Sequence, residues 1–543
     1  MKILSFNPGH DGAVVLVQDG CLSYVAEGEK DSGRRYSEVS LGTFINAVKY
    51  GEVPDVVAST GSATMIRIQS SWEELKCSIN QVDAGYFEEG ESGKTHQDDL
   101  LFGRPLKRFS STHVRSHIMC SYGLSPFPQN QPCYALIWEG LLGSFYYIDS
   151  QIAIRKICDV LVAPGNRYSL LYGIADPKLP MSARNWIQID NAGKLMAIAA
   201  YGSRRDPTAI EQQMVDLMLN LDIYGALCHG TRIKESFKEN EFFNVGVESQ
   251  SFKDLAWQFS NSLFNLFLES AQRHLTNRLP LLIAGGCGLN CDWNSRWRES
   301  GLFTDVFVPP CANDSGVAVG TAIDALHHYT GRAKIVWDVY VGDRFNEDVE
   351  ASDYFRSINF NLKDVCSRLL KGEVIGWVQG RYEMGPRALG NRSLIASPFS
   401  LEMRNRLNSI KQREPFRPIA PICLEEDFSL YFDPGTPSPH MLYFQRVKDV
   451  RLQAVTHVDG SARAQSVNDT ESPKFCALLR EFRKQSGVGV LCNTSLNFSG
   501  RGFINRLSHL FTYAVDRGID GLVVGERFWV RKYGDAVDRY LSA

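Results

Sequence analysis

Two β-hairpins of the same design, at residues 2–18 and 133–149, constrain most strongly how this chain can fold. In each hairpin a β-forming run enters a glycine-bearing turn, and a second apolar run leaves it. Each turn also carries a carboxylate, Asp11 in the first hairpin and Glu139 in the second. The repetition predicts a duplicated domain in which two equivalent turns face each other. Two unrelated hairpins are the alternative, because Gly/Asp turns are common.

Three further segments favour the duplicated domain, an arrangement found in actin and hexokinase, where phosphates and a metal lie between two lobes. Residues 109–122 predict a helix start with Ser and Thr as N-caps. Residues 280–290 (PLLIAGGCGLN) predict a strand, two glycines and a helix, an arrangement that lets backbone approach a nucleotide closely. We therefore take Gly285, Gly286 and Asn290 as candidate nucleotide-binding residues. Residues 306–326 predict a strand and an Ala/Gly-rich helix.

Two histidines on the first of these helices suggest a metal site. His113 and His117 are four positions apart and so share one helix face. They can ligate one metal if carboxylates arrive from elsewhere, and Glu139 and Asp314, at the start of the 306–326 helix, are the natural suppliers. Such a set suits iron, manganese or zinc. It is not the H-E-x-x-H pattern of a zincin protease. An accidental pair on a helix surface is the alternative.

The charge balance limits the partners of the protein. The 543 residues contain 58 Lys and Arg against 61 Asp and Glu, a formal net charge of −3. This argues against a nucleic-acid coat or a polybasic membrane binder. The 13 cysteines include no C-x-x-C pair, and no run approaches ~18 consecutive apolar residues. We expect a cytoplasmic protein with reduced thiols, without a membrane span or a cleavable signal.

The chain divides into two domains on its sequence pattern, as its length also suggests. Residues 1–340 form the first domain and residues 341–362, which are irregular and partly acidic, form a linker region. Residues 363–543 form the second domain, which we expect to begin with a helix and the strand VIGWVQ.

The second domain concentrates cationic side chains beside glycines and prolines. Guanidinium groups suit phosphate because their planar fork makes paired hydrogen bonds. The concentration predicts a polyanion site, for ATP or an acyl phosphate, and a solvated basic face is the alternative. The cationic residues between 379 and 421 are Arg381, Arg387, Arg392, Lys411, Arg413 and Arg417.

Two later segments of the second domain supply further polar candidates. Arg463 and Gln465 lie in HVDGSARAQSV, and Asn493 and Ser495 follow the apolar strand VGVLC. Short polar side chains at a strand end can hold a small planar group such as a carbamoyl amide from both its donor and acceptor sides. A polar turn with Asx capping is the alternative for 493–497.

Taken together, the chain resembles the NodU/CmcH-type O-carbamoyltransferases, the family of tobramycin, cephamycin and nodulation-factor carbamoylating enzymes. The matching segments follow the family's order over nearly the whole chain. They are GHDGAVVLVQDG, STHVRSH, AGKLMAIAAYG, GGCGLNCDWN, NDSGVAVGTA, QGRYEMGPRALGNRSLIASP, IKQREPFRPIAP, HVDGSARAQSV and CNTSLNFSGRGFI.

The resemblance implies a fold of mixed α/β and α+β class. The N-terminal domain is expected to be Kae/TsaD-like, a duplicated ribonuclease-H-like domain of the actin and heat-shock-ATPase type, and the C-terminal domain YrdC-like. The second domain would form carbamoyl-adenylate from ATP and carbamoyl phosphate. The first would pass the carbamoyl group to a hydroxyl of a small-molecule acceptor in natural-product biosynthesis and release AMP.

The resemblance also implies roles for individual residues. A divalent metal would be held by His113, His117, Glu139 and Asp314. Fe²⁺ is the expected metal, and Mn²⁺ or Zn²⁺ are the alternatives. Mg²⁺ would accompany ATP. His10 would orient or deprotonate the acceptor hydroxyl. Lys194 would contact nucleotide or the lobe interface, or be structural. The family pattern is also compatible with a homodimer. The residues expected to bind ATP and carbamoyl phosphate are Arg387, Arg392, Lys411, Arg417, Arg463, Gln465, Asn493 and Ser495, with Arg387 and Arg417 as catalytic candidates.

Three departures from the family pattern leave other functions open. Glu139 stands where an aspartate is usual, Arg35 is a candidate substitute for a family lysine, and SGRGFI replaces a Gly-Glu-Pro-like turn. A non-catalytic, actin-like nucleotide-binding regulator is therefore one alternative. A tRNA threonylcarbamoyl-modification enzyme is another, although the net charge speaks against RNA binding.

Overall fold

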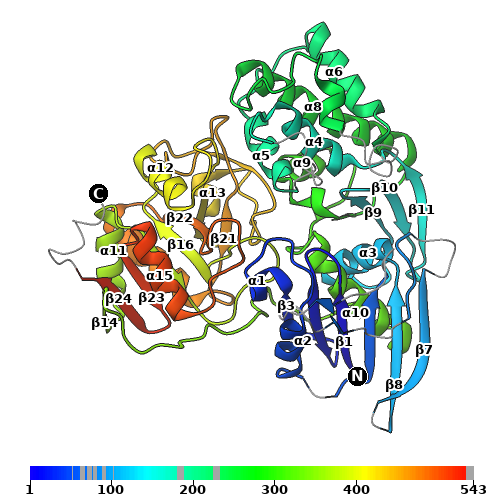
Figure 1. The fold of residues 1–543 in the computed structure, drawn as a ribbon, viewed down its shortest axis with the longest axis horizontal. Helices are drawn as coiled ribbons and strands as arrows, with labels where there is room; N and C mark the ends of the chain where they lie inside the picture. The colour runs from blue at the N-terminus through cyan, green and yellow to red at the C-terminus, as the bar shows by residue number, and fades with distance from the viewer. Residues whose placement is uncertain are drawn as a thin grey trace.

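The structure, a computed structural model, describes residues 1–51, 53–61, 68–69, 76–77, 82–87, 93–101, 103–179, 189–223 and 233–532. The predicted second domain therefore ends, at 533–543, outside the described residues. The chain forms mixed α/β sheets with helices packed on them (Figure 1). The first sheet contains, in spatial order, β3 (Cys21–Glu27), β2 (Ala13–Gln18), β1 (Lys2–Asn7), β4 (Val56–Thr60), β8 (Arg104–Ser111) and β7 (Lys94–Leu101).

The second sheet repeats the plan of the first. In both sheets a three-stranded antiparallel meander is extended by two parallel strands on the side of its first strand. This shared order confirms that the two predicted hairpins are equivalent parts of a duplication. The strands are β11 (Ile154–Asp159), β10 (Gly143–Ile148), β9 (Cys133–Trp138), β12 (Leu281–Ala284) and β13 (Val306–Phe307).

Two helices connect the sheets. The predicted helix at 109–122 is α3 (His113–Leu124), which packs on β9 and β12 of the second sheet. The Ala/Gly-rich segment forms α10 (Val317–Thr330), which packs on β1 and β4 of the first sheet and against α3. Small residues allow a very close approach, since a Cβ added at Gly320 would lie 1.7 Å from the carbonyl oxygen of Ser116.

Further helices cover the outer faces of the N-terminal half. An apolar cluster joins the second sheet to the upper group of helices in Figure 1. These helices are α4 (Pro164–Ala175), α5 (Asp190–Ala199), α6 (Ala209–Asn220), α8 (Gln250–His274) and α9 (Cys291–Glu299), while α1 (Gly28–Ser32) and α2 (Leu41–Val48) follow β3. No helix among the described residues is long and apolar enough to cross a membrane.

The C-terminal half forms a separate body built on an eight-stranded sheet (Figure 1). Its first strand lies inside the segment 341–362, which the sequence pattern predicts as a linker, and pairs antiparallel with the last strand. The strands in spatial order are β14 (Phe355–Asn359), β24 (Arg527–Arg531), β23 (Gly521–Val524), β15 (Ile375–Val378), β16 (Arg392–Ala396), β22 (Val490–Ser495), β17 (Ala420–Leu424) and β21 (Gln465–Val467).

Two apolar clusters pack helices against this sheet. The helices are α11 (Leu362–Leu370), α12 (Leu401–Ile410), α13 (Phe428–Tyr431), α14 (Pro473–Ser486) and α15 (Leu507–Arg517). Short strands complete the fold: β18 (Phe432–Asp433), β19 (Gln445–Val447) and β20 (Ser461–Ala462) form one small sheet, and β5 (Ile68–Gln69) pairs with β6 (Lys76–Cys77).

The two halves are joined by buried polar contacts. The Lys30 ammonium of α1 donates to the carbonyl oxygens of Glu383 and Gly385 in the C-terminal half, the second at 2.8 Å. The Glu27 carboxylate pairs with Lys30 and accepts from the amide of Gly385 at 2.6 Å. These contacts fix, against the first sheet, the loop that carries Arg387.

Candidate functional site

The candidate site lies where parallel strands of the two N-terminal sheets end. The turn after β1 supplies His10, α3 follows β8 directly, and Glu139 follows β9. The segment after β13 supplies Asp314, which begins a short 3₁₀ turn leading into α10. The carboxyl ends of parallel strands are where ligands bind in open α/β sheets. The duplication therefore brings residues from both halves of the domain to one place.

Local structure sets the direction of the two helical histidines. Thr112 is the N-cap of α3, and its hydroxyl accepts from the amide of Arg115, as the sequence predicts for a Ser/Thr cap. All residues of α3 are buried, His113 and His117 included, and the rings of these two histidines are 4.8 Å apart in an edge-to-face arrangement. The alternative of a surface pair is thereby excluded.

The four predicted metal ligands converge. Their candidate ligand atoms all lie within 4.8 Å of one another. Nε2 of His113 is 3.4 Å from Oε2 of Glu139 and 3.7 Å from Oδ2 of Asp314. Nε2 of His117 is 3.5 Å from Oε2 of Glu139 and 3.3 Å from Oδ1 of Asp314. We call these four residues the His/carboxylate cluster.

The polar atoms of the cluster fit a divalent cation. Nε2 of His113 and of His117 is buried, and neither has a hydrogen-bond partner of good geometry in the part of the chain that the structure describes. Buried polar atoms are almost always satisfied, so two such nitrogens facing carboxylates indicate a ligand. Two imidazoles and two carboxylates are a donor set for iron, manganese or zinc.

Electrostatics within the cluster agree with this fit. Burial would raise the pKa of Glu139, but His113 and His117 outweigh it and lower the pKa to about 2. Burial would also raise the pKa of Asp314, and the three neighbouring histidines lower it instead. Both carboxylates are therefore ionised at neutral pH.

His10 lies at the exposed side of the cluster. Its side chain is 58% exposed, and its two ring nitrogens lie 3.2 Å from Oδ2 of Asp314 and 3.5 Å from Oδ2 of Asp11. The Asp314 charge is the main cause that raises the pKa of His10, to about 9. An exposed imidazole between two carboxylates can exchange a proton with a ligand bound beside it.

A second site is formed by four arginines, of which only Arg417, 3.7 Å from Glu414, has an anionic partner in the part of the chain that the structure describes. Burial lowers the pKa of Arg387 to about 9, and Arg463 and Arg417 add repulsion. Burial also lowers the pKa of Arg413 to about 9, again with repulsion from Arg417 and Arg463. Nε of Arg387 and Nε of Arg463 are buried without a hydrogen-bond partner among the described residues. We call the following four residues the arginine cluster: Arg387, Arg413, Arg417 and Arg463. Their guanidinium groups are suited to bind an anion.

Two predicted amides lie behind the loop that carries Arg387. Nδ2 of Asn493 donates to Oε1 of Gln465 at 2.8 Å and to the carbonyl oxygen of Ala388 at 3.1 Å. Nε2 of Gln465 donates to the carbonyl oxygen of Leu389 at 2.7 Å. Oδ1 of Asn493 is buried and has no hydrogen-bond partner among the described residues, so it can accept from a bound amide.

Two of the predicted binding residues are turned inward. The fully buried Arg392 guanidinium donates to the carbonyl oxygens of Gln379 and Asn391 and to the Asn505 side chain, so it holds loops together. The Lys411 ammonium donates to the carbonyl oxygens of Ser495 and Asn497 and to the Asn497 side chain, and burial lowers its pKa well below the usual range.

Other predicted residues also make contacts within the protein. Asn290 caps α9 through its side-chain oxygen, and the Ser495 hydroxyl donates to the Asn497 side chain at 2.6 Å. Lys194 lies at the interface of the two halves, 3.3 Å from Glu414. Gly285 has φ of 96°, and an added Cβ would lie 2.4 Å from the carbonyl oxygen of Trp138, so a close backbone approach requires this glycine. At Gly286 an added Cβ would meet no atom within 4 Å.

The structure adds two residues to those predicted from the sequence. Arg413, part of the cationic run, belongs to the arginine cluster although we did not assign it a binding role. Tyr86 contacts the His/carboxylate cluster, where its hydroxyl donates to Oε1 of Glu139 at 3.0 Å. Its loop has no periodic pattern that could have indicated this position.

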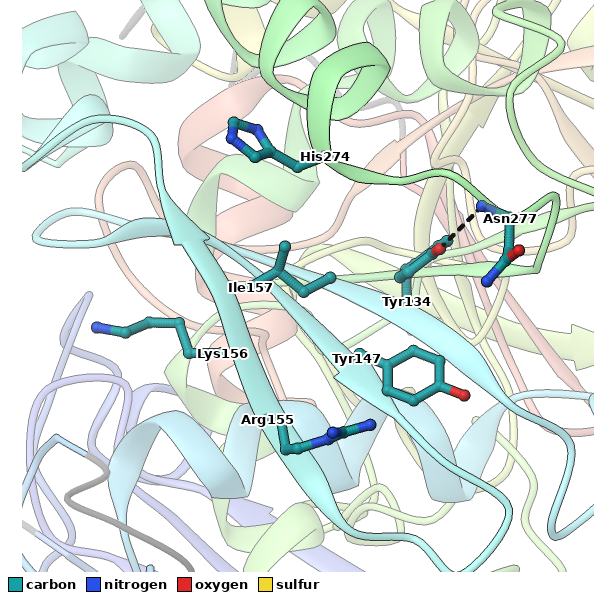
Figure 2. Close-up of a pocket in the computed structure, with 7 residues that line it drawn as sticks. All are labelled: Tyr134, Tyr147, Arg155, Lys156, Ile157, His274 and Asn277. Atoms are coloured by element: carbon teal, nitrogen blue, oxygen red, sulfur yellow. Dashed lines mark hydrogen bonds between the residues drawn. The ribbon is translucent and has the colours of Figure 1, made fainter.

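A separate groove lies on the second sheet, away from both clusters. Figure 2 shows its lining side chains, with the amide of Asn277 donating to the Tyr134 hydroxyl at 3.3 Å. The groove holds no acidic side chain and none of the predicted site residues, so we do not assign the reaction to it. Its residues are Tyr134, Tyr147, Arg155, Lys156, Ile157, His274 and Asn277.

Comparison with known proteins identifies the class. Residues 100–323 match the family described as carbamoyltransferase N-terminus, and residues 366–532 match carbamoyltransferase C-terminus. The chain belongs to the carbamoyltransferase family. It is 45% identical over 539 residues to 3'-hydroxymethylcephem-O-carbamoyltransferase of Amycolatopsis lactamdurans, a match that covers 98% of this chain and all of the relative. It is 33% identical to nodulation protein U of Rhizobium tropici, covering 93% of this chain and 92% of that protein.

Proposed function

We propose that the protein is an ATP-dependent O-carbamoyltransferase that carbamoylates a hydroxymethyl group of a cephem or a similar small molecule. The observation that carries this proposal is the buried His/carboxylate cluster with His10 at its exposed side. The acceptor class follows from the relative that shares 45% identity over nearly the whole chain. The domains that we predict, 1–340 and 363–543, would divide the reaction as Kae-like transfer and YrdC-like activation domains.

The arginine cluster would bind the phosphorylated substrates. Carbamoyl phosphate loses its phosphate to water, and a carbamate oxygen attacks the α-phosphorus of ATP, so that pyrophosphate leaves and carbamoyl-adenylate remains. Arg387 and Arg463 each have a buried Nε that has no hydrogen-bond partner among the described residues and could donate to phosphate oxygens. Asn493 would accept from the carbamoyl amide through its buried Oδ1.

The transfer step would take place at the His/carboxylate cluster. A divalent metal held by the four cluster residues would act as a Lewis acid that polarises the carbamoyl carbonyl group. A cation held by the cluster would offset the Asp314 charge that keeps His10 protonated, so the neutral imidazole of His10, between Asp11 and Asp314, would accept the proton of the acceptor hydroxyl. The acceptor oxygen then bonds to the carbamoyl carbon, and the bond to the adenylate oxygen breaks, so that AMP leaves with the electron pair.

Two measurements on the purified protein test the proposal. With ATP, Mg²⁺ and carbamoyl phosphate we expect pyrophosphate release, and on adding a 3'-hydroxymethylcephem we expect a product heavier by one carbamoyl group. Absence of pyrophosphate release with Fe²⁺, Mn²⁺ and Zn²⁺ would argue against the activation step. Pyrophosphate release without cephem product would instead argue against the acceptor, and a screen of other hydroxylated molecules by mass spectrometry would replace it.

A further inference from the structure

Tyr86 lies in the segment 82–87, which passes over the N-terminal end of α3. The carbonyl oxygen of Gly85 accepts from the amide of His113, and that of Tyr86 accepts from the amide of Val114, both at 3.3 Å. The segment therefore satisfies two of the amides that a helix leaves without partners at its start. It contacts the very turn of α3 that carries the first histidine of the cluster.

The backbone of this segment is held in place by the neighbouring strands. The Ser59 hydroxyl donates to the carbonyl oxygen of Val82, and the Ser110 hydroxyl accepts from the amide of Ala84, both at 3.1 Å. A Cβ added at Gly61, the residue after β4, would lie 2.0 Å from the carbonyl oxygen of Gly85, so the chain at Gly61 and the segment pack without room for a side chain. Tyr86 thus starts from a fixed position.

The Tyr86 side chain contacts two members of the cluster. Its ring stacks on the His113 imidazole with centroids 4.3 Å apart and planes at 11°. Its hydroxyl donates to Oε1 of Glu139 at 3.0 Å, whereas Oε2 is the oxygen that faces the two histidines. The two oxygens of this carboxylate are therefore divided between Tyr86 and the ligand site.

We propose that Tyr86 is a positioning residue that makes Glu139 a one-oxygen metal ligand and fixes the plane of the His113 ring. The inference rests on the metal site proposed above. A hydrogen bond to one carboxylate oxygen keeps that oxygen from turning into the cluster, so a second Glu139 oxygen does not take a coordination position. Outer-sphere partners of this kind typically contribute 10- to 100-fold to metal affinity.

The Tyr86→Phe variant isolates the hydroxyl because the stacked ring remains. We expect wild-type protein to bind one equivalent of Co²⁺, and Y86F to bind it roughly 10- to 100-fold more weakly with a changed visible absorption spectrum. The matched control is Tyr122→Phe. Tyr122 is a buried tyrosine of α3 whose hydroxyl accepts from the amide of Asn130 at 3.0 Å. Y122F should leave Co²⁺ affinity and spectrum unchanged.

A double-mutant cycle with Glu139→Asp separates positioning from packing. The shorter aspartate withdraws its carboxylate from Tyr86, so we expect E139D to weaken Co²⁺ binding and Y86F to add no further loss in that background. Equal Y86F losses in both backgrounds, or a wild-type spectrum and affinity in Y86F, would overturn the inference while leaving the metal site intact. If wild-type protein bound no Co²⁺, Fe²⁺ or Zn²⁺, the metal site would itself be rejected, and the role of Tyr86 with it.

Discussion

Nε2 of His10 lies 3.2 Å from Oδ2 of Asp314, so one carboxylate joins an exposed imidazole to the two buried imidazoles of the cluster. His10 belongs to the proposed transfer site of the N-terminal half, whereas all four residues of the arginine cluster, the proposed activation site, belong to the C-terminal half.

Replacing His10 should therefore stop transfer and spare activation. In His10→Ala we expect carbamoyl transfer to fall roughly 10²- to 10⁴-fold, the range for loss of a general base, while pyrophosphate release stays near the wild-type rate. The control is His274→Ala, which removes a histidine from the groove of Figure 2 and should change neither rate. Equal loss of both activities in H10A would contradict the division of labour.

Replacing residues of the arginine cluster should slow the activation step, and the size of this effect should differ between the residues. Arg417 lies 3.7 Å from Glu414, which partly neutralises it, whereas Arg387 has a buried Nε with no partner among the described residues. We expect Arg387→Ala to slow pyrophosphate release roughly 10- to 100-fold, as for loss of a charged hydrogen bond, and Arg417→Ala to slow it less. Arg451→Ala, which removes an exposed arginine paired with Asp449, is the control. If pyrophosphate release were slower in R417A than in R387A, the assignment of Arg387 as the more important of the two arginines would be reversed.

Much of the N-terminal site could be predicted because it depends on local patterns. The hairpins, the Thr112 cap and the four-residue spacing of His113 and His117 each follow from short-range rules. The strand ends then bring Glu139 and Asp314 to the histidines, as the duplication requires. Residue type and position relative to the strand ends were together sufficient to predict the four residues of the His/carboxylate cluster.

The sequence pattern could not show whether a buried cationic side chain binds carbonyl groups of the protein or faces an anion site. Lys411 and Arg392 stand near glycines or prolines as Arg387 does, yet they bind backbone carbonyls of neighbouring loops. Only the three-dimensional course of those loops distinguishes a cation that satisfies the protein from one that awaits an anion. Tyr86 was missed for a related reason, because its contact with Glu139 depends on a segment without regular secondary structure.

The close contact of α3 and α10 should make Gly320 intolerant of any side chain. A Cβ at this position would lie 1.7 Å from the carbonyl oxygen of Ser116, so Gly320→Ala forces apart the helices that carry the cluster. We expect a loss of about 1–3 kcal/mol in the free energy of unfolding, measured by urea denaturation. Gly193→Ala is the matched control, because this glycine of α5 has no atom within 4 Å of an added Cβ. G193A should be stabilising by about 0.5–1 kcal/mol, and similar effects of the two variants would refute the packing explanation.

Asp324 of α10 and Arg115 of α3 form a buried ion pair behind the cluster. Nε and Nη2 of Arg115 lie 2.7 and 3.0 Å from the two carboxylate oxygens, and the Ser111 hydroxyl donates to Oδ2 at 2.7 Å. Removing one partner leaves an uncompensated buried charge, so Asp324→Asn should reduce the free energy of unfolding by about 3–5 kcal/mol. Asp364→Asn, which breaks a partly exposed pair with Arg368 that Arg368 can replace with Glu373, should change it by less than about 1 kcal/mol.

The ionisation of Asp324 also predicts how this difference depends on pH. Burial would raise the pKa of Asp324, but Arg115 and Ser111 outweigh it, so its pKa in the folded protein is below the ordinary value. Above pH ~5 the carboxylate is ionised in both states, and its full contribution is present. As pH falls below ~4, the unfolded chain takes up the proton first, and wild-type stability decreases through this group. Urea denaturation from pH 6 to 3 should therefore show that the difference in the free energy of unfolding between wild type and D324N becomes smaller only at the acid end. If this difference in the free energy of unfolding became larger at the acid end, the Asp324 carboxylate would be protonated more readily in the folded protein than in the unfolded chain. That result would contradict the pairing of Asp324 with Arg115.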